Sequence, residues 1–91
     1  MNQAIQFDNE LTIIDNSVRF NAQQQGQVLV CVVSFADLQA LNQQLNYANE
    51  VVSSENALQV FESLRFDIEE LAEQQILDEQ VNGQGEVHIS A

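Results

Sequence analysis

The sequence predicts an α+β fold with the order β-β-β-α-α-β, in which a small antiparallel sheet packs against two helices, the second one long. Three observations support this class. The chain has 91 residues, enough for a single domain over 1–91. Its first third alternates apolar and polar residues, the period of a strand with one buried face. From Ser34 onward, apolar residues recur every three or four positions, as on one face of a helix.

Two early segments have the period-two pattern. Residues 4–7 alternate Ile5 and Phe7 with polar neighbours, and residues 18–22 alternate Val18, Phe20 and Ala22 with polar ones. Residues 11–14 either extend the first strand or cross to the second, with a turn at residues 15–16. Residues 23–26 are expected to form a hairpin turn, because Gly26 can adopt a positive φ.

Residues 28–33 are apolar at every position, which is typical of a central strand covered on both faces. If both helices lie on one face of the sheet, nothing else in the chain can cover the other. Either the helices cover opposite faces or a second subunit provides the cover, since an exposed uncharged strand promotes aggregation. A homodimer is therefore a hypothesis from the sequence.

Two helices are predicted after these strands. Ser34 and Asp37 resemble a capping box at the start of the first, whose apolar stripe is Phe35, Leu38, Leu41 and Leu45. Residues 46–49 weaken that helix, and Ser53 or Ser54 can cap the next. Residues 55–79 contain no helix breaker and are expected to form one long helix. Its expected core stripe is Leu58, Phe61, Leu64, Ile68, Leu71, Ala72 and Ile76. Residues 82–85 end it, and Val87 and Ile89 flank His88 in a last strand.

The charge excludes several functions. The chain has fourteen acidic residues, two arginines and no lysine, for a net charge of -12. Residues 50–91 carry most of this negative charge. Nucleic-acid binding through a basic surface and binding to an anionic membrane are both excluded. Residues 1–10 lack the features of a signal peptide, and six apolar residues at 28–33 are too few to span a bilayer. We therefore expect a cytoplasmic protein.

Three segments carry a family resemblance: Val18-Arg19-Phe20, then Cys31-Val32-Val33-Ser34 followed by Leu38, and finally residues 61–72. With these, the chain resembles short bacterial proteins of the domain of unknown function 1488 family. The resemblance covers nearly the whole chain. It implies a stand-alone α+β domain of bacterial origin, with no assigned activity, catalytic residue or cofactor.

The residues themselves give little support to catalysis. Cys31 lies within an apolar strand and is expected to pack in the core, and a single cysteine and histidine exclude a disulfide and a Cys/His zinc site. His88 alternates with apolar neighbours and is expected to face solvent. No serine has a nucleophile-elbow pattern. We predict a protein that is not an enzyme and has no cofactor or metal site.

Glutamates of the long helix are the only possible metal ligands: Glu62, Glu69, Glu70 and Glu73. Di-iron bundles combine such glutamates with histidines, which this segment lacks. Weak association with a divalent cation is the alternative to an ordinary solvated acidic face.

Each arginine has two interpretations. Arg65 has Glu62 at i−3 and Glu69 at i+4, so a local ion-pair cluster is expected. Arg19 projects from the sheet face opposite Val18 and Phe20. If that face forms a ligand pocket, Arg19 is its natural anchor for a carboxylate or phosphate. A small anionic-ligand-binding domain that uses Arg19 or Arg65 is the alternative function.

Phe66 and Leu77 are eleven residues apart and share the helix face opposite the core stripe. Together with Glu62, Glu70 and Glu73 they suggest a contact for a partner that brings basic residues. The alternatives are ordinary exposure or cover by the first helix. The favoured function is therefore a non-enzymatic protein-binding or regulatory module, acting on another protein or on a second copy of itself.

Overall fold

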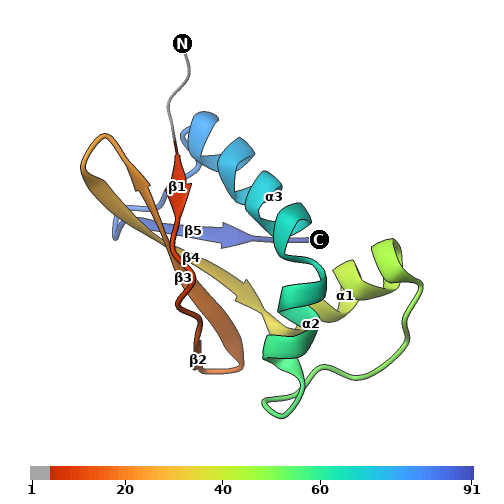
Figure 1. The fold of residues 1–91 in the computed structure, drawn as a ribbon. Coiled ribbons are helices and arrows are strands. Elements are labelled where there is room, and N and C mark those ends of the chain that lie inside the picture. Colours follow the sequence, from red (N-terminus) through yellow and green to blue (C-terminus); the bar gives the residue numbers. More distant parts are fainter. Residues whose placement is uncertain (1–4) are drawn as a thin grey trace.

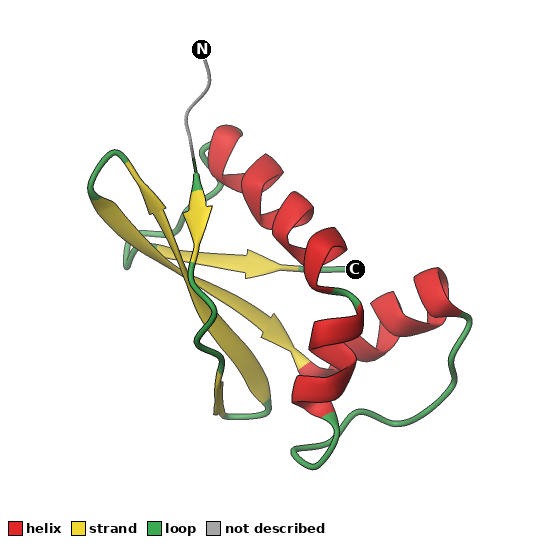
Figure 2. Ribbon diagram, in the orientation of Figure 1, coloured by secondary structure: helices red, strands yellow, loops and turns green. Residues whose placement is uncertain are grey.

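The computed structural model describes residues 5–91, which form a five-stranded sheet with three helices on one of its faces (Figures 1 and 2). The elements are β1 (Gln6–Phe7), β2 (Thr12–Ile14), β3 (Ser17–Gln24), β4 (Gln27–Ser34), α1 (Phe35–Asn46), α2 (Ala57–Ser63), α3 (Arg65–Leu77) and β5 (Glu86–Ile89). The predicted α+β class and element order are confirmed. Ala4, the first residue of the first predicted strand, lies outside the described residues.

β4 is the central strand. It pairs with β3 on one side and with β5 on the other, and both β1 and β2 pair with the far edge of β3. Only β5 runs parallel to its neighbour; the other pairs are antiparallel. The parallel pair follows from the long connection through the three helices, which returns the chain to the sheet in the same direction.

Two tight turns set the register of the hairpins. Asp15 and Asn16 have φ values of 51° and 58°, and Gln25 and Gly26 have φ values of 54° and 79°. Two consecutive residues with positive φ define the two-residue turn that matches the twist of antiparallel strands. Residues 12–14 therefore form a strand of their own against β3, and the second predicted turn narrows to Gln25–Gly26.

The two faces of the sheet differ. The face toward the helices carries the strand residues that are buried: Val18, Phe20, Ala22, Leu29, Cys31, Val33, Val87 and Ile89. On the other face Val32 is also buried, whereas Val28 is 53% exposed. All three helices lie on one side of the sheet (Figure 1), so the expected cover of the other side of β4 is met within the chain at Val32 but not at Val28. Of the two arrangements considered in the sequence analysis, the one with helices on opposite faces of the sheet is excluded.

α1 begins and ends as its sequence predicts. The Ser34 hydroxyl accepts the Asp37 backbone N–H at 3.1 Å and donates to the Asp37 carboxylate at 3.0 Å, which confirms the cap. The helix ends at Asn46, and Tyr47 follows in the left-handed region with φ 55°. Its N–H donates to the carbonyl of Asn42, which satisfies one of the last free carbonyls.

The predicted long helix is wrong: residues 57–77 form two helices that meet at Leu64, where φ is −115° and ψ is 10°. Just before this residue, the Ser63 hydroxyl donates to the Val60 carbonyl at 2.8 Å. Such a bond to the preceding turn favours a bend in a helix. Leu64 donates its own N–H to Phe61, a tighter turn than that of an α-helix. The side chain of Leu64 is buried and holds the bend in the core.

The bend also changes which residues face inward. Leu58, expected in the core, is 41% exposed, whereas Ala57 and Val60 are buried in its place. The start of α2 differs as well. Neither serine is its N-cap: Asn56 occupies that position without a side-chain cap, and Ser53 instead accepts the N–H of Glu55. In the second half of the predicted core stripe, Ile68, Ala72 and Ile76 are buried as expected. α3 ends at Leu77, before the predicted end. Within residues 5–91, no helix is long and apolar enough to cross a bilayer.

Candidate functional site

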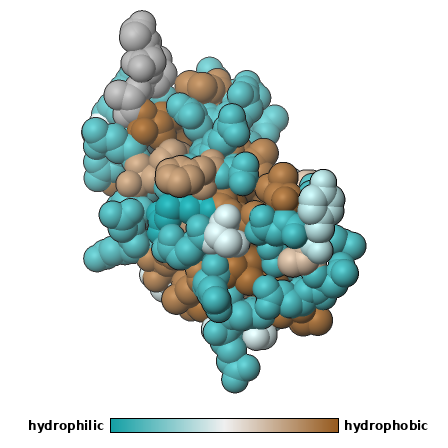
Figure 3. Space-filling view, turned by 45° about the vertical axis from the view of Figure 1, so that its right-hand side comes forward, coloured by the Kyte–Doolittle hydropathy of each residue, from teal (hydrophilic) through white to brown (hydrophobic). Residues whose placement is uncertain are grey.

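The outer side of α2 and α3 carries the five residues that the sequence singled out as a contact, which we call the acidic helical surface: Glu62, Phe66, Glu70, Glu73 and Leu77. All five are exposed. Phe66 is 83% exposed and Leu77 48%, so the first helix does not cover either. Figure 3 turns the helical side forward and shows mostly hydrophilic side chains with separate hydrophobic areas between them.

The geometry of α3 explains this exposure. Ile68, Ala72 and Ile76 point into the core, and Phe66 lies on the opposite side of the same helix. Glu70 and Glu73 follow Phe66 at i+4 and i+7 and therefore share its face. The result is a large aromatic side chain in water with carboxylates beside it.

Arg65 joins the two helices across the bend. Its guanidinium donates two hydrogen bonds to Glu62, at 2.6 and 2.8 Å, and one to Glu69 at 3.4 Å. It also lies 5.5 Å from the centre of the Phe61 ring. The hydrogen bonds from Arg65 lower the pKa of Glu62, and those to Glu62 raise the pKa of Arg65. The predicted ion-pair cluster is confirmed, and the guanidinium is already occupied by two carboxylates.

Sequence reasoning missed a groove between α1 and α3. It has a volume of about 240 Å³ and is lined by Leu41, Gln44, Leu45, Asp67, Glu70, Leu71, Ser90 and Ala91. Glu70 therefore belongs to both the groove and the acidic helical surface. The half-exposed Leu45, at the end of the α1 stripe, was the available signal, but the position of α3 beside it depends on the bend at Leu64.

The uncovered side of the sheet, which we call the open sheet face, carries the strand residues opposite the core: Thr12, Arg19, Asn21, Val28, Val30, Val32, Glu86 and His88. Arg19 projects there as predicted, with its Nη1 3.9 Å from the carboxylate of Glu86. Its Nε is buried and has no acceptor among residues 5–91. Beside it lies a depression of about 200 Å³ that Arg19 shares with Glu10, Thr12 and Ile14 among others.

His88 also lies on the open sheet face and is exposed, as predicted. Its Nε2 is 3.0 Å from Glu86 Oε1. This hydrogen bond is the main cause that lowers the pKa of Glu86, and a second bond from Asn82 adds to it. No serine, threonine or cysteine side chain takes part in these contacts.

Cys31 is fully buried on the covered face of the sheet, and burial raises the pKa of its thiol to about 12. The thiol is therefore protonated at neutral pH and unreactive. Glu62, Glu69, Glu70 and Glu73 do not gather: across residues 5–91, no three His, Cys, Asp or Glu side chains are placed to hold a metal ion.

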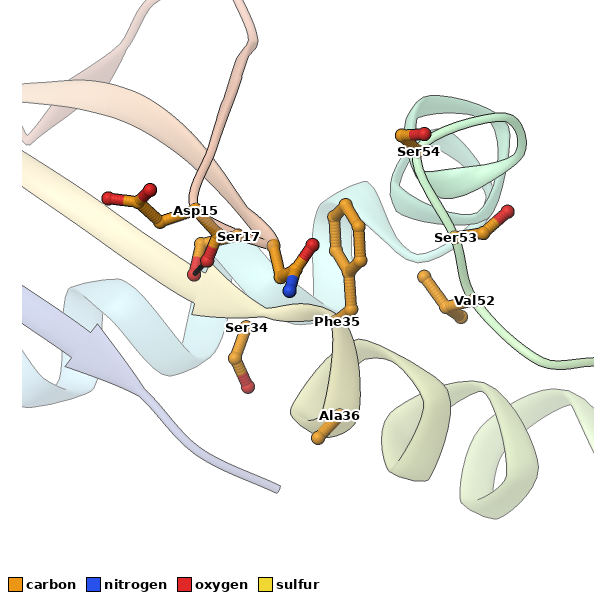
Figure 4. A pocket seen from close by; sticks show the side chains of 9 residues that line it. Asp15, Ser17, Ser34, Phe35, Ala36, Val52, Ser53 and Ser54 are labelled. Carbon is orange, nitrogen blue, oxygen red and sulfur yellow. Dashed lines mark hydrogen bonds between the residues drawn. The ribbon is translucent and has the colours of Figure 1, made fainter.

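Another depression, of about 610 Å³, lies beside the start of α1 (Figure 4). The ring of Phe35 stands between the β2–β3 turn and the segment that carries Val52 and Ser53. The remaining lining groups are hydroxyls, an amide and the carboxylate of Asp15. Ser34 is already used as the cap of α1. This lining contains no histidine, lysine or cysteine.

A small α+β domain with an acidic helical side and an open sheet face is thus defined. The chain belongs to the family described as protein of unknown function (DUF1488), whose model matches residues 5–89. It is similar to a protein of unknown function of this family from Shewanella loihica PV-4, known from a crystal structure at 1.60 Å resolution. The two share 39% identity over 99% of this chain and 96% of that one, with a TM-score of 0.85. No curated protein matches.

Proposed function

We propose that this chain is a non-enzymatic, cytoplasmic protein-binding module. It docks through the acidic helical surface on a partner whose apolar side chains are flanked by Lys or Arg. The observation that carries this proposal is Phe66, which is 83% exposed on a helix that carries four acidic residues. Large exposed apolar side chains bordered by polar ones are typical of interaction sites.

The energetics favour a contact of this kind. Burying Phe66 contributes roughly 1.5–3 kcal/mol and Leu77 less, since it is already half covered. The neighbouring carboxylates, with a net charge of -12 behind them, attract basic partners and speed their encounter. The groove between α1 and α3 offers a place for one apolar anchor of the partner, with Asp67 and Glu70 at hand for its basic flank.

The test uses a defined probe, a helical peptide of about 20 residues with Leu on one face and Lys on the other. Calorimetry at low salt is expected to show binding that weakens strongly with salt, because the charges on both sides are exposed. Replacement of Phe66→Ser is expected to weaken this binding about tenfold, which corresponds to the loss of one buried aromatic side chain.

The matched control is Val51→Ser, which removes another largely exposed apolar side chain, in the loop after α1. It is expected to leave the affinity unchanged. A Lys/Gln peptide without leucines measures the attraction that any acidic protein exerts on a polycation. Equal binding of both peptides, or equal affinity of the Phe66→Ser variant, would contradict the proposal.

A second candidate function is the binding of a small anion at Arg19, and the unpaired Nε of that residue favours it. Glu10 in the same depression and Glu86 nearby repel an anion, so we rank this candidate lower. A thermal-shift series with a small dicarboxylate tests it. Stabilisation that is lost in Arg19→Ala would support it, and no shift at millimolar ligand would exclude it.

A further inference from the structure

Charge is divided unevenly between the two sides of the molecule. The three helices carry six carboxylates and Arg65, a net charge of −5. The five strands carry only Glu86 and Arg19, a net charge of zero with His88 neutral. A second copy of the same chain is therefore repelled by the helical side and meets little repulsion at the open sheet face.

On the open sheet face, β4 carries valines at three positions. Its three valines at positions 28, 30 and 32 form a row along the centre of the sheet, in which Val28 is 53% exposed, Val30 is partly exposed and Val32 is buried. Arg19 and Asn21 are paired to that row on β3. Glu86 and His88 are paired to it on β5. Opposite charges thus lie on either side of a row of valines.

We propose that two copies of this chain pack through their open sheet faces as a symmetric homodimer. A two-fold axis along β4 stacks β3 of one copy over β5 of the other. This stacking brings Arg19 of each copy to the Glu86 and His88 of its partner, while Val28 and Val30 of the two β4 strands cover one another. Arg19 is available for it, because its contact with Glu86 within the chain is 3.9 Å, longer than a charge-assisted hydrogen bond.

The dimer leaves both acidic helical surfaces outward, so it is compatible with the proposed function but independent of it. Two further acids, Asp8 and Glu10, lie at the margin: Asp8 bonds to Asn21, and Glu10 lines the depression beside Arg19. From strand spacing and rise, each copy contributes on the order of 400 Å² of flat sheet. An interface of that size is small, so we expect a weak dimer that forms at high concentration.

Sedimentation equilibrium tests the proposal. The chain at about 300 µM is expected to approach twice its mass of 10.2 kDa and to dissociate on dilution. Val28→Glu places two like charges at the interface and is expected to weaken association on the order of 100-fold. The matched control is Phe66→Glu, which adds the same charge on the helical side and is expected to leave the mass unchanged.

Charge exchange sharpens the assignment. Arg19→Glu alone is expected to give monomers, and the double variant Arg19→Glu/Glu86→Arg is expected to restore the dimer. If a variant does not fold, isotope-filtered NMR of a mixed labelled and unlabelled wild type decides, through contacts between the Val28 methyls of different copies. A monomer at 300 µM, contacts through α3 instead, or a dimer lost in Phe66→Glu but kept in Val28→Glu would overturn the proposal.

Discussion

Arg19 and Phe20 are neighbours in sequence, yet their surroundings are opposite. Phe20 is buried on the covered face of the sheet, where its ring packs against Phe61 of α2 with centres 5.2 Å apart. Arg19 points to the open sheet face, where its nearest charged partner is 3.9 Å away. The same alternation directs Cys31 to the covered face and its sequence neighbours on β4 to the open sheet face. One face of the strands thus packs against the helices, whereas the other is only partly covered and leaves Val28 exposed.

The largest test of this difference compares substitutions on the two faces. Phe20→Ala is expected to lower the free energy of unfolding by about 3–5 kcal/mol, because it leaves a cavity against Phe61. Val28→Ala on the open face is expected to cost less than about 0.5 kcal/mol. Urea denaturation at concentrations where the chain is monomeric measures both. Similar costs would show that the two faces contribute equally and would refute the comparison.

A smaller effect, the pH dependence of stability caused by Cys31, concerns the covered face alone. Burial raises the pKa of Cys31 to about 12 from an ordinary value of 9.0, so its thiol ionises first in the unfolded chain. The contribution of the protonated Cys31 thiol to the free energy of unfolding is therefore complete below pH 9 and is lost as the pH rises toward 12. The slope approaches about 1.4 kcal/mol per pH unit. Denaturation between pH 8 and about 11 measures it. Cys31→Ala is expected to remove this slope, and an unchanged slope in that variant would contradict the prediction.

The smallest effect compares one carboxylate on each side. The pKa values of Glu86 and Glu62 are both lowered, mainly by hydrogen bonds from His88 and Arg65 respectively. Each contact therefore stabilises the chain above the ordinary carboxyl pKa and loses this effect as the pH falls through the lowered value. Carboxyl NMR titrations are expected to show that His88→Ala raises the pKa of Glu86 only, and that Arg65→Met raises that of Glu62 only. A change in both carboxylates from one substitution would show that the sides are coupled.

Much of the fold was predictable because local rules act at identifiable residues. Alternation in residues 18–22 gives β3, the Ser34–Asp37 cap gives the start of α1, and Val87 and Ile89 give β5. The family resemblance, confirmed by the family model, agrees with all three. Helical spacing placed Phe66 and Leu77 on the far side of the core stripe, but it left open whether the first helix covers them; the structure shows both exposed.

The bend at Leu64 was not predictable in the same way. Residues 55–79 contain no glycine or proline, and Ser63 is an ordinary helix residue until its hydroxyl bonds to Val60. Whether it does so depends on the tertiary fit of Leu64 in the core. The exchange of Leu58 for Val60 in the core follows from this bend. The same is true of the groove between α1 and α3, because its walls come from helices that the bend positions.

The buried thiol of Cys31 makes the molecule a reporter of its own opening. A thiol reagent in solution cannot reach it while the sheet and helices stay together, and the chain has no other cysteine to react. Each modified molecule is then one that has unfolded at least locally, so the rate of labelling counts opening events without any engineered probe. A partner that binds the folded chain and suppresses opening would lower the rate of Cys31 labelling, and this decrease would detect its binding.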